Sequence, residues 1–438
     1  MSAARAARAS RLRSTVAWGG LAGALACDLV LAVGGAATRS AAFPTDVERL
    51  PHPALKGALA PVADALGLAM TPALVAILVL VASACYLLVI GFAAGVPARA
   101  ALGVVLVLHL ALAVAPPLLS ADVFGYLAYA RLGVIHGLDP YLHPPAAGTG
   151  DPLLPFVGLQ GLRSPYGPLF TLLTYPLALL GVTAGMWLLK ALAALGALAC
   201  LVLVAGCARR LGRDANAALL FVGLNPLWLV WAVGGAHNDL IMMAVVMGAL
   251  ELMLRGRPVE GGVAGAVAVA LKPTAVVILP FLIAGARRRR AALAGVAGGA
   301  AAVVALSALA FGRGLAGYVD ATLAQGRLVS HYSVPSALAR GLGLPEPGAG
   351  ARAACAVAGL GGVLVALRAV IRGVDAIAGA GWALLAVVVA STWLYPWYLV
   401  WVLPLAGASG SRALRAATLA ACGLVLAVRF PLGLTSPL

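Results

Sequence analysis

Residues 71–95 read TPALVAILVLVASACYLLVIGFAAG, a long apolar run that contains no charged side chain. A helix needs about 20 consecutive apolar residues to cross the hydrocarbon core of a bilayer, so this run predicts a spanning helix. Runs of the same kind follow one another along the chain, because hydrophobic residues occupy 63% of the 438 positions and charged residues only 10%. We therefore expect an all-α integral membrane protein, a multi-span helical bundle with about 11–13 spans.

The apolar runs assign the whole chain, residues 1–438, to a single polytopic membrane domain without a sizeable soluble part. The first run follows four N-terminal arginines and is longer than the apolar core of a signal peptide, so we interpret it as an uncleaved span. The expected spans cover residues 15–36, 71–95, 101–119, 184–207, 215–232, 238–254, 258–271, 273–286, 291–312, 350–370, 375–392, 394–408 and 413–431.

The formal net charge is +16, but the sequence has no stripe of Lys and Arg with interleaved aromatic residues, so we expect no nucleic acid partner. The basic residues form short clusters between apolar runs, as in cytoplasmic loops of membrane proteins. An N-terminus in the cytoplasm places 18 of the 30 basic residues on the inner side: Arg5, Arg8, Arg11, Arg13, Arg99, Arg209, Arg210, Arg213, Arg255, Arg257, Arg287, Arg288, Arg289, Arg290, Arg368, Arg372, Arg412 and Arg415.

This orientation requires that residues 166–183 do not cross the bilayer, and it predicts a re-entrant or interfacial helix there. Two long polar loops, residues 120–165 and 313–349, then lie on the outer face, where we expect the catalytic and substrate-binding groups. The expected spans 258–271 and 273–286 are short and are separated by Lys272-Pro273. Short, broken helices typically line a cavity rather than face lipid.

All six cysteines lie within or at the edge of apolar runs, without a CxxC pair, so we expect neither a disulfide nor a metal site. The sequence also has no Walker A motif, no GxGxxG between a strand and a helix, and no HExxH. We therefore expect no cofactor, and an enzyme acting at the outer face without a nucleotide site has to draw an activated substrate from a carrier that reaches this face.

The most informative polar stretch is Ser120-Ala-Asp-Val-Phe-Gly-Tyr126, which begins where the third expected span ends. Asp122, Tyr126 and Tyr129 are spaced to share one face of a helix. A carboxylate at the mouth of a membrane cavity, beside rings that can stack on a sugar, can take a proton from a hydroxyl nucleophile. Alternatively, the acid only complements the N-terminus of the helix.

A second polar group, His237-Asn238-Asp239, follows two glycines between apolar runs. Three consecutive polar side chains at this place are costly unless they bind something. Alternatively, Asn238 caps the next helix. Asp28 is a lone acid inside the first expected span, and we expect it to be paired within the bundle.

Five cations are within reach of the outer face and can stabilise a leaving phosphate. Lys272 is the most informative, because an ammonium between two apolar helices has no obvious structural role; its alternative is to extend to the lipid headgroups. The other four are Arg131, Arg163, Arg327 and His331. The last two lie in the second outer loop, and loops are also simply polar.

Aromatic residues gather in Trp393-Leu-Tyr-Pro-Trp-Tyr398. Tyr395 and Trp397 can stack on a carbohydrate, or they belong to an interfacial aromatic belt.

Taken together, these stretches resemble bacterial GT-C fold mannosyltransferases, specifically the polyprenyl-phosphomannose-dependent α-1,6-mannosyltransferases of actinobacterial lipomannan assembly. The motifs occur in the order of that family between about residues 116 and 401, and their joint occurrence is more specific than any one of them. The resemblance rests on Ser120-Ala-Asp-Val-Phe-Gly-Tyr through Arg131, His136-Gly-Leu-Asp-Pro-Tyr141, Ser164-Pro-Tyr-Gly-Pro168, Asn225-Pro, Gly234-Gly-Ala-His-Asn-Asp239, Leu271-Lys-Pro-Thr274 and Tyr395-Pro-Trp-Tyr398.

The resemblance implies a GT-C type bundle in a bacterial inner or plasma membrane, with juxtamembrane helices and the active site on the extracytoplasmic side. It implies transfer of mannose from polyprenyl-phosphomannose to a lipid-anchored or glycan acceptor, with inversion and an α-1,6 product. Asp122 is then the base, with Asp139 and Asp239 as rivals. The expected substrate-binding residues are Tyr126, Arg131, His136, Asp139, Tyr141, Arg163, Tyr166, His237, Asn238, Asp239, Lys272, Arg327, His331, Tyr395 and Trp397.

Two alternatives stay open from the residues alone. The first alternative is that the enzyme transfers another sugar from the same class of lipid phosphate, because no single residue identifies the hydroxyl pattern of mannose. The second alternative is a lipid or solute transporter, because the chain combines many spans with broken helices and charges inside the membrane.

Overall fold

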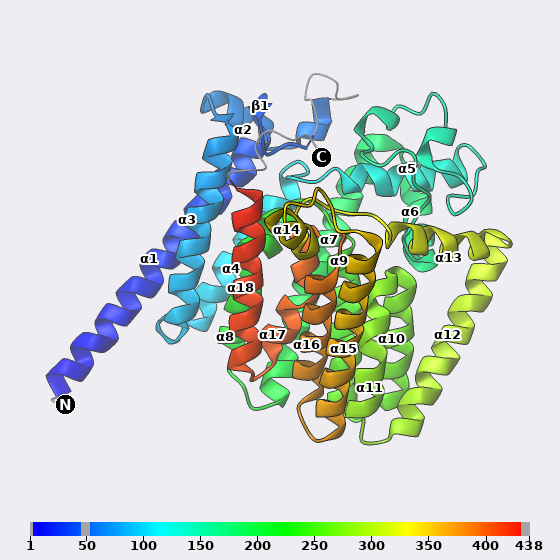
Figure 1. Ribbon diagram of the computed structural model, residues 1–438. Coiled ribbons are helices and arrows are strands. Elements are labelled where there is room, and N and C mark those ends of the chain that lie inside the picture. Colours follow the sequence, from blue (N-terminus) through cyan, green and yellow to red (C-terminus); the bar gives the residue numbers. More distant parts are fainter. Residues whose placement is uncertain (1–2, 45–52, 431–438) are drawn as a thin grey trace.

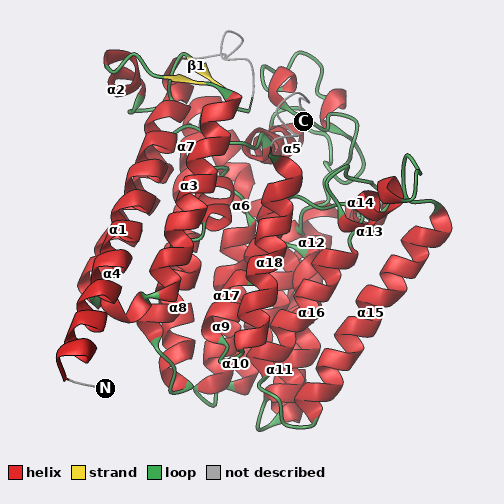
Figure 2. Cartoon of the chain, turned by 60° about the vertical axis from the view of Figure 1, so that its left-hand side comes forward, coloured by secondary structure: helices red, strands yellow, loops and turns green. Residues whose placement is uncertain are grey.

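The computed structural model describes residues 3–44 and 53–430, and it is a helical bundle (Figures 1 and 2). The strands within these residues are β1 (Arg39–Ser40) and β2 (Ala69–Met70), which form one short parallel pair. The expected all-α architecture is confirmed. All six cysteines are free.

Five helices are long and apolar enough to cross a membrane within the described part of the chain. They are α1 (Ala3–Gly35), α3 (Pro72–Gly91), α7 (Gly181–Arg210), α12 (Arg289–Phe311) and α15 (Ala349–Ile371). A sixth span results if α8 (Ala215–Gly223) is joined to the π-helical segment η6 (Leu227–Val233), which is bent from it by 53°.

The other expected spans form shorter helices, and three of them, residues 215–232, 273–286 and 394–408, are each divided into two helical pieces. The short apolar helices are α4 (Ala98–Val114), α9 (Asp239–Leu254), α10 (Pro258–Leu271), η7 (Pro273–Ile278) with α11 (Leu279–Gly285), α16 (Ala376–Ala390), and η8 (Pro396–Trp401) with α17 (Leu403–Ala408). Helix α18 (Arg412–Arg429) completes the bundle. Hydropathy alone reports the length of an apolar run but not where its helix breaks, although the outer bounds can agree closely: the expected span 258–271 coincides with α10.

Helices α10 and α12 approach closely through small residues. A Cβ atom on Gly262 of α10 or on Gly295 of α12 would collide with the backbone of the other helix. Small residues that let backbones approach are the usual basis of helix packing in membranes.

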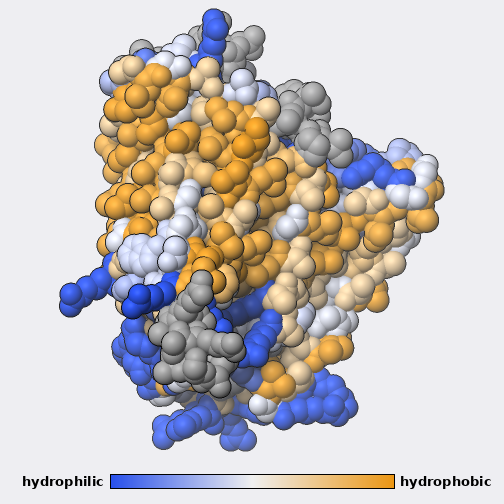
Figure 3. All heavy atoms as spheres, turned by 90° about the vertical axis from the view of Figure 1, so that its left-hand side faces the viewer, coloured by the Kyte–Doolittle hydropathy of each residue, from blue (hydrophilic) through white to orange (hydrophobic). Residues whose placement is uncertain are grey.

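The two ends of the bundle differ in charge. The turns after α7, α9, α11, α15 and α17 carry the arginine clusters, and they lie together at the lower end in Figure 1. Figure 3 shows strongly polar side chains at this end, below a broad apolar band. We call it the basic end. The opposite end, which contains residues 53–70, 115–178, 234–239, 272–274 and 312–348, is called the loop end.

The loop end consists of short elements. These are η2 (Pro53–Lys56), α2 (Ala60–Ala65), α5 (Asp122–Val134), η4 (Pro145–Ala147), η5 (Leu154–Phe156), α6 (Pro168–Ala178), α13 (Gly314–Gln325) and α14 (Val334–Gly341), while η3 (Ala93–Gly95) connects α3 to α4. Helix α6 occupies the segment expected to be re-entrant or interfacial. Its 11 residues extend about 16 Å, which is too short to span a bilayer. Where it lies relative to lipid stays a prediction.

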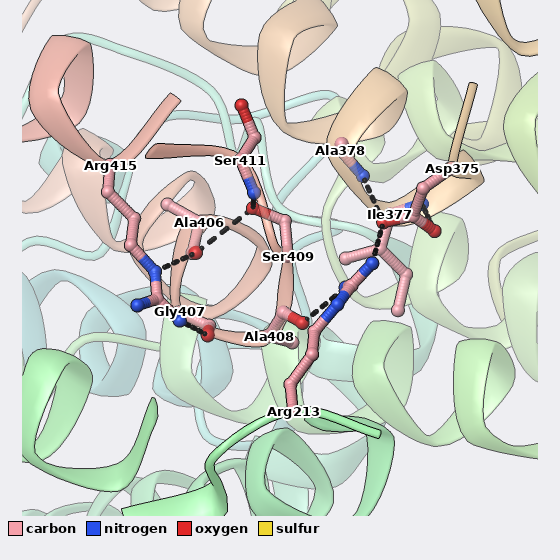
Figure 4. A network of polar contacts seen from close by, with 10 residues as sticks. All are labelled: Arg213, Asp375, Ile377, Ala378, Ala406, Gly407, Ala408, Ser409, Ser411 and Arg415. Atoms are coloured by element: carbon pink, nitrogen blue, oxygen red, sulfur yellow. Dashed lines mark hydrogen bonds and ion pairs between the residues drawn. The ribbon is translucent and has the colours of Figure 1, made fainter. Parts of the chain in front are cut away.

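At the basic end, two arginines close the turn between α17 and α18 (Figure 4). Arg415 donates to the carbonyl oxygens of Ala406 (3.1 Å) and Gly407 (2.7 Å), and Arg213 donates to that of Ala408 (2.6 Å). Arg213 also pairs with Asp375 (3.1 Å), whose carboxylate caps the start of α16. These contacts satisfy the last carbonyls of a helix with cations, which is a structural role.

Asp28 differs from expectation. It is buried in α1, and neither carboxylate oxygen has a hydrogen-bond partner among the described residues. Helix α1 packs mainly against α3, which is almost entirely apolar and offers no donor to the acid.

Candidate functional site

A cavity of about 390 Å³ lies at the loop end, a volume typical of small-molecule sites. Five segments that are distant in the sequence form it: the start of α5, the loop before α6, the break between α10 and η7, α13, and the stretch that leads into η8. Its polar and aromatic lining includes Asp122, Tyr129, Arg163, Tyr166, Lys272, Thr274, Gln325, Trp393, Tyr395, Trp397, Tyr398 and Trp401.

Asp122 presents a carboxylate to this cavity from the first turn of α5. Its backbone N–H donates to the Ser120 hydroxyl (3.2 Å), which fixes the start of the helix. The side chain is 34% exposed, and its Oδ2 lies 3.3 Å from Nδ1 of the fully buried His237. One side of the carboxylate is thus held by the protein while the other remains accessible.

His237 holds Asp122 from behind the cavity wall. Its ring stacks on Trp397 with a centroid distance of 4.1 Å and an angle of 20°. Its Nε2 is buried without a partner among the described residues, whereas Nδ1 faces the carboxylate. Nδ1 lies 3.3 Å from the Asp122 carboxylate and 3.4 Å from the Tyr126 hydroxyl, so the buried ring contacts the carboxylate and limits its movement.

Lys272 is the second charged group of the cavity. Pro273 ends α10, and Lys272 adopts an extended conformation (φ −151°, ψ 125°) that carries its side chain away from both helices. Its Nζ lies 2.6 Å from Asp239 Oδ1 and 3.2 Å from Asn238 Oδ1. Trp401 Nε1 donates to the same Asp239 oxygen. Lys272 is therefore fixed inside the site rather than extended to the membrane surface.

The turn His237-Asn238-Asp239 thus contacts both charged groups of the cavity. His237 contacts Asp122, and Asp239 binds Lys272. None of the three residues lines the cavity. Asn238 makes no side-chain cap on α9, although the sequence suggests one. Asp239 is fully buried and bound to Lys272 and Trp401, so it is not placed to accept a proton from a substrate.

Arg163 is the other cation in the cavity lining. No carboxylate lies within ion-pair distance of it among the described residues, and its one hydrogen bond is a long contact with the Tyr141 carbonyl oxygen (3.5 Å). The charge of Lys272 is balanced by Asp239, whereas that of Arg163 is available to an anion.

Aromatic rings form one side of the cavity. Tyr395 stacks on Trp397 at 4.5 Å and 9°, and Tyr398 stacks on Trp401 at 4.4 Å and 21°. Tyr126 is buried beneath the lining, where its ring meets Tyr166 edge to face at 4.9 Å. The stretch expected to be either sugar-binding or an interfacial belt therefore contributes its rings to the cavity.

Arg131 and His136 lie outside the cavity lining and bind Asp151. Arg131 Nε and His136 Nε2 are each 2.9 Å from Asp151 Oδ2. Burial by itself raises the pKa of Asp151, but hydrogen bonds from His136, the Leu153 amide and Arg131 outweigh it and lower the pKa below its ordinary value. This triad fixes the loop that continues into the cavity lining at residues 157–163.

Asp139 and Tyr141 also lie outside the lining. Asp139 accepts a hydrogen bond from the Tyr141 amide (2.8 Å), and burial raises the pKa of its carboxyl. The Tyr141 hydroxyl bonds Thr171 (2.8 Å) and the Tyr166 carbonyl oxygen (3.0 Å). As a rival base, Asp139 is not placed to reach a substrate in this cavity.

Arg327 and His331 are exposed beyond the end of α13 and do not line the cavity. Gln325, the last residue of α13, does line it, so this segment contributes an amide to the cavity where the sequence predicts a cation.

Asp151 and Lys190 are not singled out by the sequence, whereas Thr274 and Trp393 belong to motifs that the sequence indicates but were not among the expected site residues. Lys190 had an available signal, because it is the one charged residue in the apolar run 184–207. In addition, the described residues contain no group of three His, Cys, Asp or Glu side chains that could hold a metal ion.

Two family models match the chain. The family model described as "Alpha-(1->6)-mannopyranosyltransferase, N-terminal domain" matches residues 17–288, and the one described as "MptB C-terminal domain" matches residues 341–437. Alpha-(1->6)-mannopyranosyltransferase A of Mycobacterium tuberculosis is 32% identical over 342 residues, which are 70% of this chain and 64% of the relative.

Alpha-(1->6)-mannopyranosyltransferase A of Corynebacterium glutamicum is 32% identical over 173 residues, or 39% of this chain and 35% of the relative. Alpha-(1->6)-mannopyranosyltransferase B of the same organism is 28% identical over 148 residues, or 32% and 24%. The chain thus matches less than two thirds of the length of these relatives. No solved structure matches it.

Proposed function

Because the chain belongs to the alpha-(1->6)-mannopyranosyltransferase family, we propose that it transfers mannose from a polyprenyl-phosphate carrier to a lipid-linked or glycan acceptor. The observation that carries the proposal is that one cavity holds an accessible carboxylate, Asp122, together with two cations, Lys272 and Arg163. A single displacement at a sugar carbon needs these groups: a base for the nucleophile and positive charge for the leaving phosphate.

In the proposed reaction, Asp122 accepts the proton of the acceptor hydroxyl while its oxygen forms a bond to C1 of mannose. The bond between C1 and the phosphate oxygen breaks, and the electron pair leaves with the polyprenyl phosphate. Arg163 and Lys272 stabilise the charge that develops on this oxygen. Because the new bond forms as the old one breaks on the opposite side, the reaction inverts C1, and the proposed product is an α-1,6 mannoside.

The walls of the cavity support a lipid-linked donor. Stacked rings of Tyr395 and Trp397 offer a flat apolar surface to a sugar ring. Val157, Leu159 and Val387 add aliphatic surface to the same cavity, and the lining carries no glycine-rich nucleotide-binding loop between a strand and a helix.

The charge distribution supports the orientation. The arginine clusters lie at the basic end, which the positive-inside rule assigns to the cytoplasm together with the start of α1. We place the loop end, and with it the cavity, on the extracytoplasmic side, where a polyprenyl-linked sugar is available and a nucleotide sugar is not.

The test is a transfer assay with purified protein in lipid nanodiscs. We expect radiolabelled mannose to pass from polyprenyl-phosphomannose to an α-mannoside acceptor, and no transfer from a nucleoside-diphosphate mannose. The product linkage is read by NMR. Equal or greater transfer from the nucleotide donor would overturn the proposed donor class. Transfer of another sugar at a higher rate in donor competition would overturn mannose, and movement of the lipid across vesicles without any transfer would overturn the enzyme.

A further inference from the structure

Lys190 is a buried lysine to which none of the steps above assigns a role. It lies in α7 and is completely inaccessible to solvent. Its Nζ donates to the carbonyl oxygens of Gly234 (2.8 Å) and Pro116 (3.4 Å), and no carboxylate lies within ion-pair distance of it among the described residues. An amine in an apolar helix is costly to bury, so its two contacts require an explanation.

The two acceptors belong to the two segments that carry the reactive groups. Pro116 precedes Asp122 in the connection from α4 to α5, and Gly234 precedes His237 in the turn from η6 to α9. The Leu118 amide donates to the same Gly234 oxygen (3.0 Å). One carbonyl group therefore joins α7, the segment of the acid and the segment of the histidine.

Each of the two segments contains one residue with a strained backbone conformation. Leu119 (φ 55°) and Ala236 (φ 58°) are the non-glycine residues with positive φ in the described part of the chain, and each segment contains one of them. Side chains other than glycine rarely adopt this conformation, and it persists only where surrounding contacts enforce it. Lys190 provides such contacts to both segments.

We propose that Lys190 is a positioning residue for the transfer reaction: its amine clamps the two strained segments together, so that His237 stays within hydrogen-bond distance of Asp122. This inference rests on the proposed function for its effect on turnover, but not for its effect on the backbone. A neutral amine has two N–H donors and an ammonium has three, so the clamp operates in either protonation state.

The primary variant is Lys190→Met, which keeps most of the side-chain volume and removes the donors. We expect kcat to fall 10- to 100-fold while KM changes less than threefold, because the groups that contact the substrate remain in the cavity. We also expect backbone hydrogen exchange, followed by mass spectrometry, to rise in peptides that cover residues 115–122 and 234–239. Unchanged exchange in both peptides, or a kcat within twofold of wild type, would overturn the clamp.

A second substitution separates strain from general damage. Glycine adopts positive φ without penalty, so Ala236→Gly added to Lys190→Met is expected to recover at least threefold in kcat. If kcat does not recover, backbone strain at Ala236 is not the cause of the loss, and this part of the proposal is wrong. If Lys190→Met does not fold, Lys190→Gln keeps two shorter donors, and an intermediate loss of kcat with increased exchange is expected; wild-type values for both would overturn the proposal.

The matched control is Tyr86→Phe, which also removes one buried hydrogen bond to a backbone carbonyl, that of Phe221 (2.7 Å). We expect it to lower thermal stability but to leave kcat and the exchange of the two peptides unchanged. The two proposals fail in distinguishable ways: a wild-type protein without transfer refutes the function, whereas increased exchange in Lys190→Met still supports the clamp.

Discussion

The two ends of the bundle use the same residue types in different ways. At the basic end, Arg213, Arg415 and Asp375 bind helix ends and one another, and the carbonyl oxygens of the turn accept their hydrogen bonds (Figure 4). At the loop end, His237 and Asp239 each keep a buried polar atom without a partner among the described residues, next to a cavity.

Backbone geometry follows the same division. The positive-φ residues Leu119 and Ala236 lie at the loop end, whereas at the basic end the side chains of Asp375 and Ser411 cap the starts of α16 and α18. Buried polar groups that are fully bound by the protein stabilise it, whereas strain and unpartnered atoms beside a cavity indicate a site for a ligand. The difference supports the proposal that the substrate binds at the loop end, while the contacts at the basic end stabilise the bundle.

Of the ion pairs at the two ends, the one at the loop end should give the larger effect, and only loss of the proposed base Asp122 should lower transfer more. Lys272→Met should lower the transfer rate by about 10²–10³-fold, because it removes a cation from the developing phosphate charge. It should also destabilise the protein by about 3–5 kcal/mol, since Asp239 stays buried without its partner. Adding Asp239→Asn should restore most of the thermal stability but not the transfer. Recovery of both together would show that Lys272 is only structural.

An ion pair at the basic end should give the opposite result. Arg213→Met removes hydrogen bonds to Asp375 and to the Ala408 carbonyl oxygen, so we expect the free energy of unfolding to fall by about 1–3 kcal/mol. Transfer per folded molecule should stay within twofold of wild type. Thermal unfolding in detergent and a transfer assay normalised to folded protein measure the two quantities. A tenfold loss of normalised transfer would break the proposed division between the ends.

Asp151 provides a smaller effect that depends on pH. Its pKa is lower in the folded protein than in the unfolded chain, so its stabilisation is complete above about pH 4 and is lost as the pH falls through the folded pKa. We expect Asp151→Asn to be less stable than wild type by about 1 kcal/mol near neutral pH. The difference in thermal midpoint should shrink from pH 6 to pH 3, and a constant difference over this range would contradict the assignment.

The smallest effect is expected at Arg327. This residue is exposed beyond α13 and lies outside the cavity lining, so Arg327→Ala should change neither transfer nor thermal stability by a measurable amount.

The matched comparison for Arg327→Ala is Arg163→Gln. This variant removes the cavity cation that has no carboxylate partner among the described residues, and it should lower kcat/KM about 10-fold or more. Equal losses in the two variants would show that the phosphate is bound outside the cavity.

The sequence predicted those features that depend on local pattern. Apolar runs indicated a membrane-embedded helical bundle, and Lys272-Pro273 indicated a break between two helices, because both signals lie within a few residues. Asp122 was also identified correctly as a group of the cavity, since an acid directly after an apolar run is unusual.

Features that depend on distant partners could not be predicted in this way. Nothing in the sequence indicates that Arg131 and His136 bind Asp151 rather than a substrate, or that Asp239 binds Lys272, 33 positions away. The exclusion of Arg327 and the double contact of Lys190 likewise follow from how helices pack, which a single sequence does not encode in any short pattern.

In the proposed reaction, Asp122 acts as the base, and the cations of the same cavity bind the phosphate. The most direct measurement compares Asp122→Asn with wild type in two assays, transfer from polyprenyl-phosphomannose and equilibrium binding of the product polyprenyl phosphate. We expect transfer to fall by about 10³-fold or more, because the base is lost, while the dissociation constant for the product stays within threefold. Transfer within tenfold of wild type, or a parallel loss of binding and transfer, would contradict the claim.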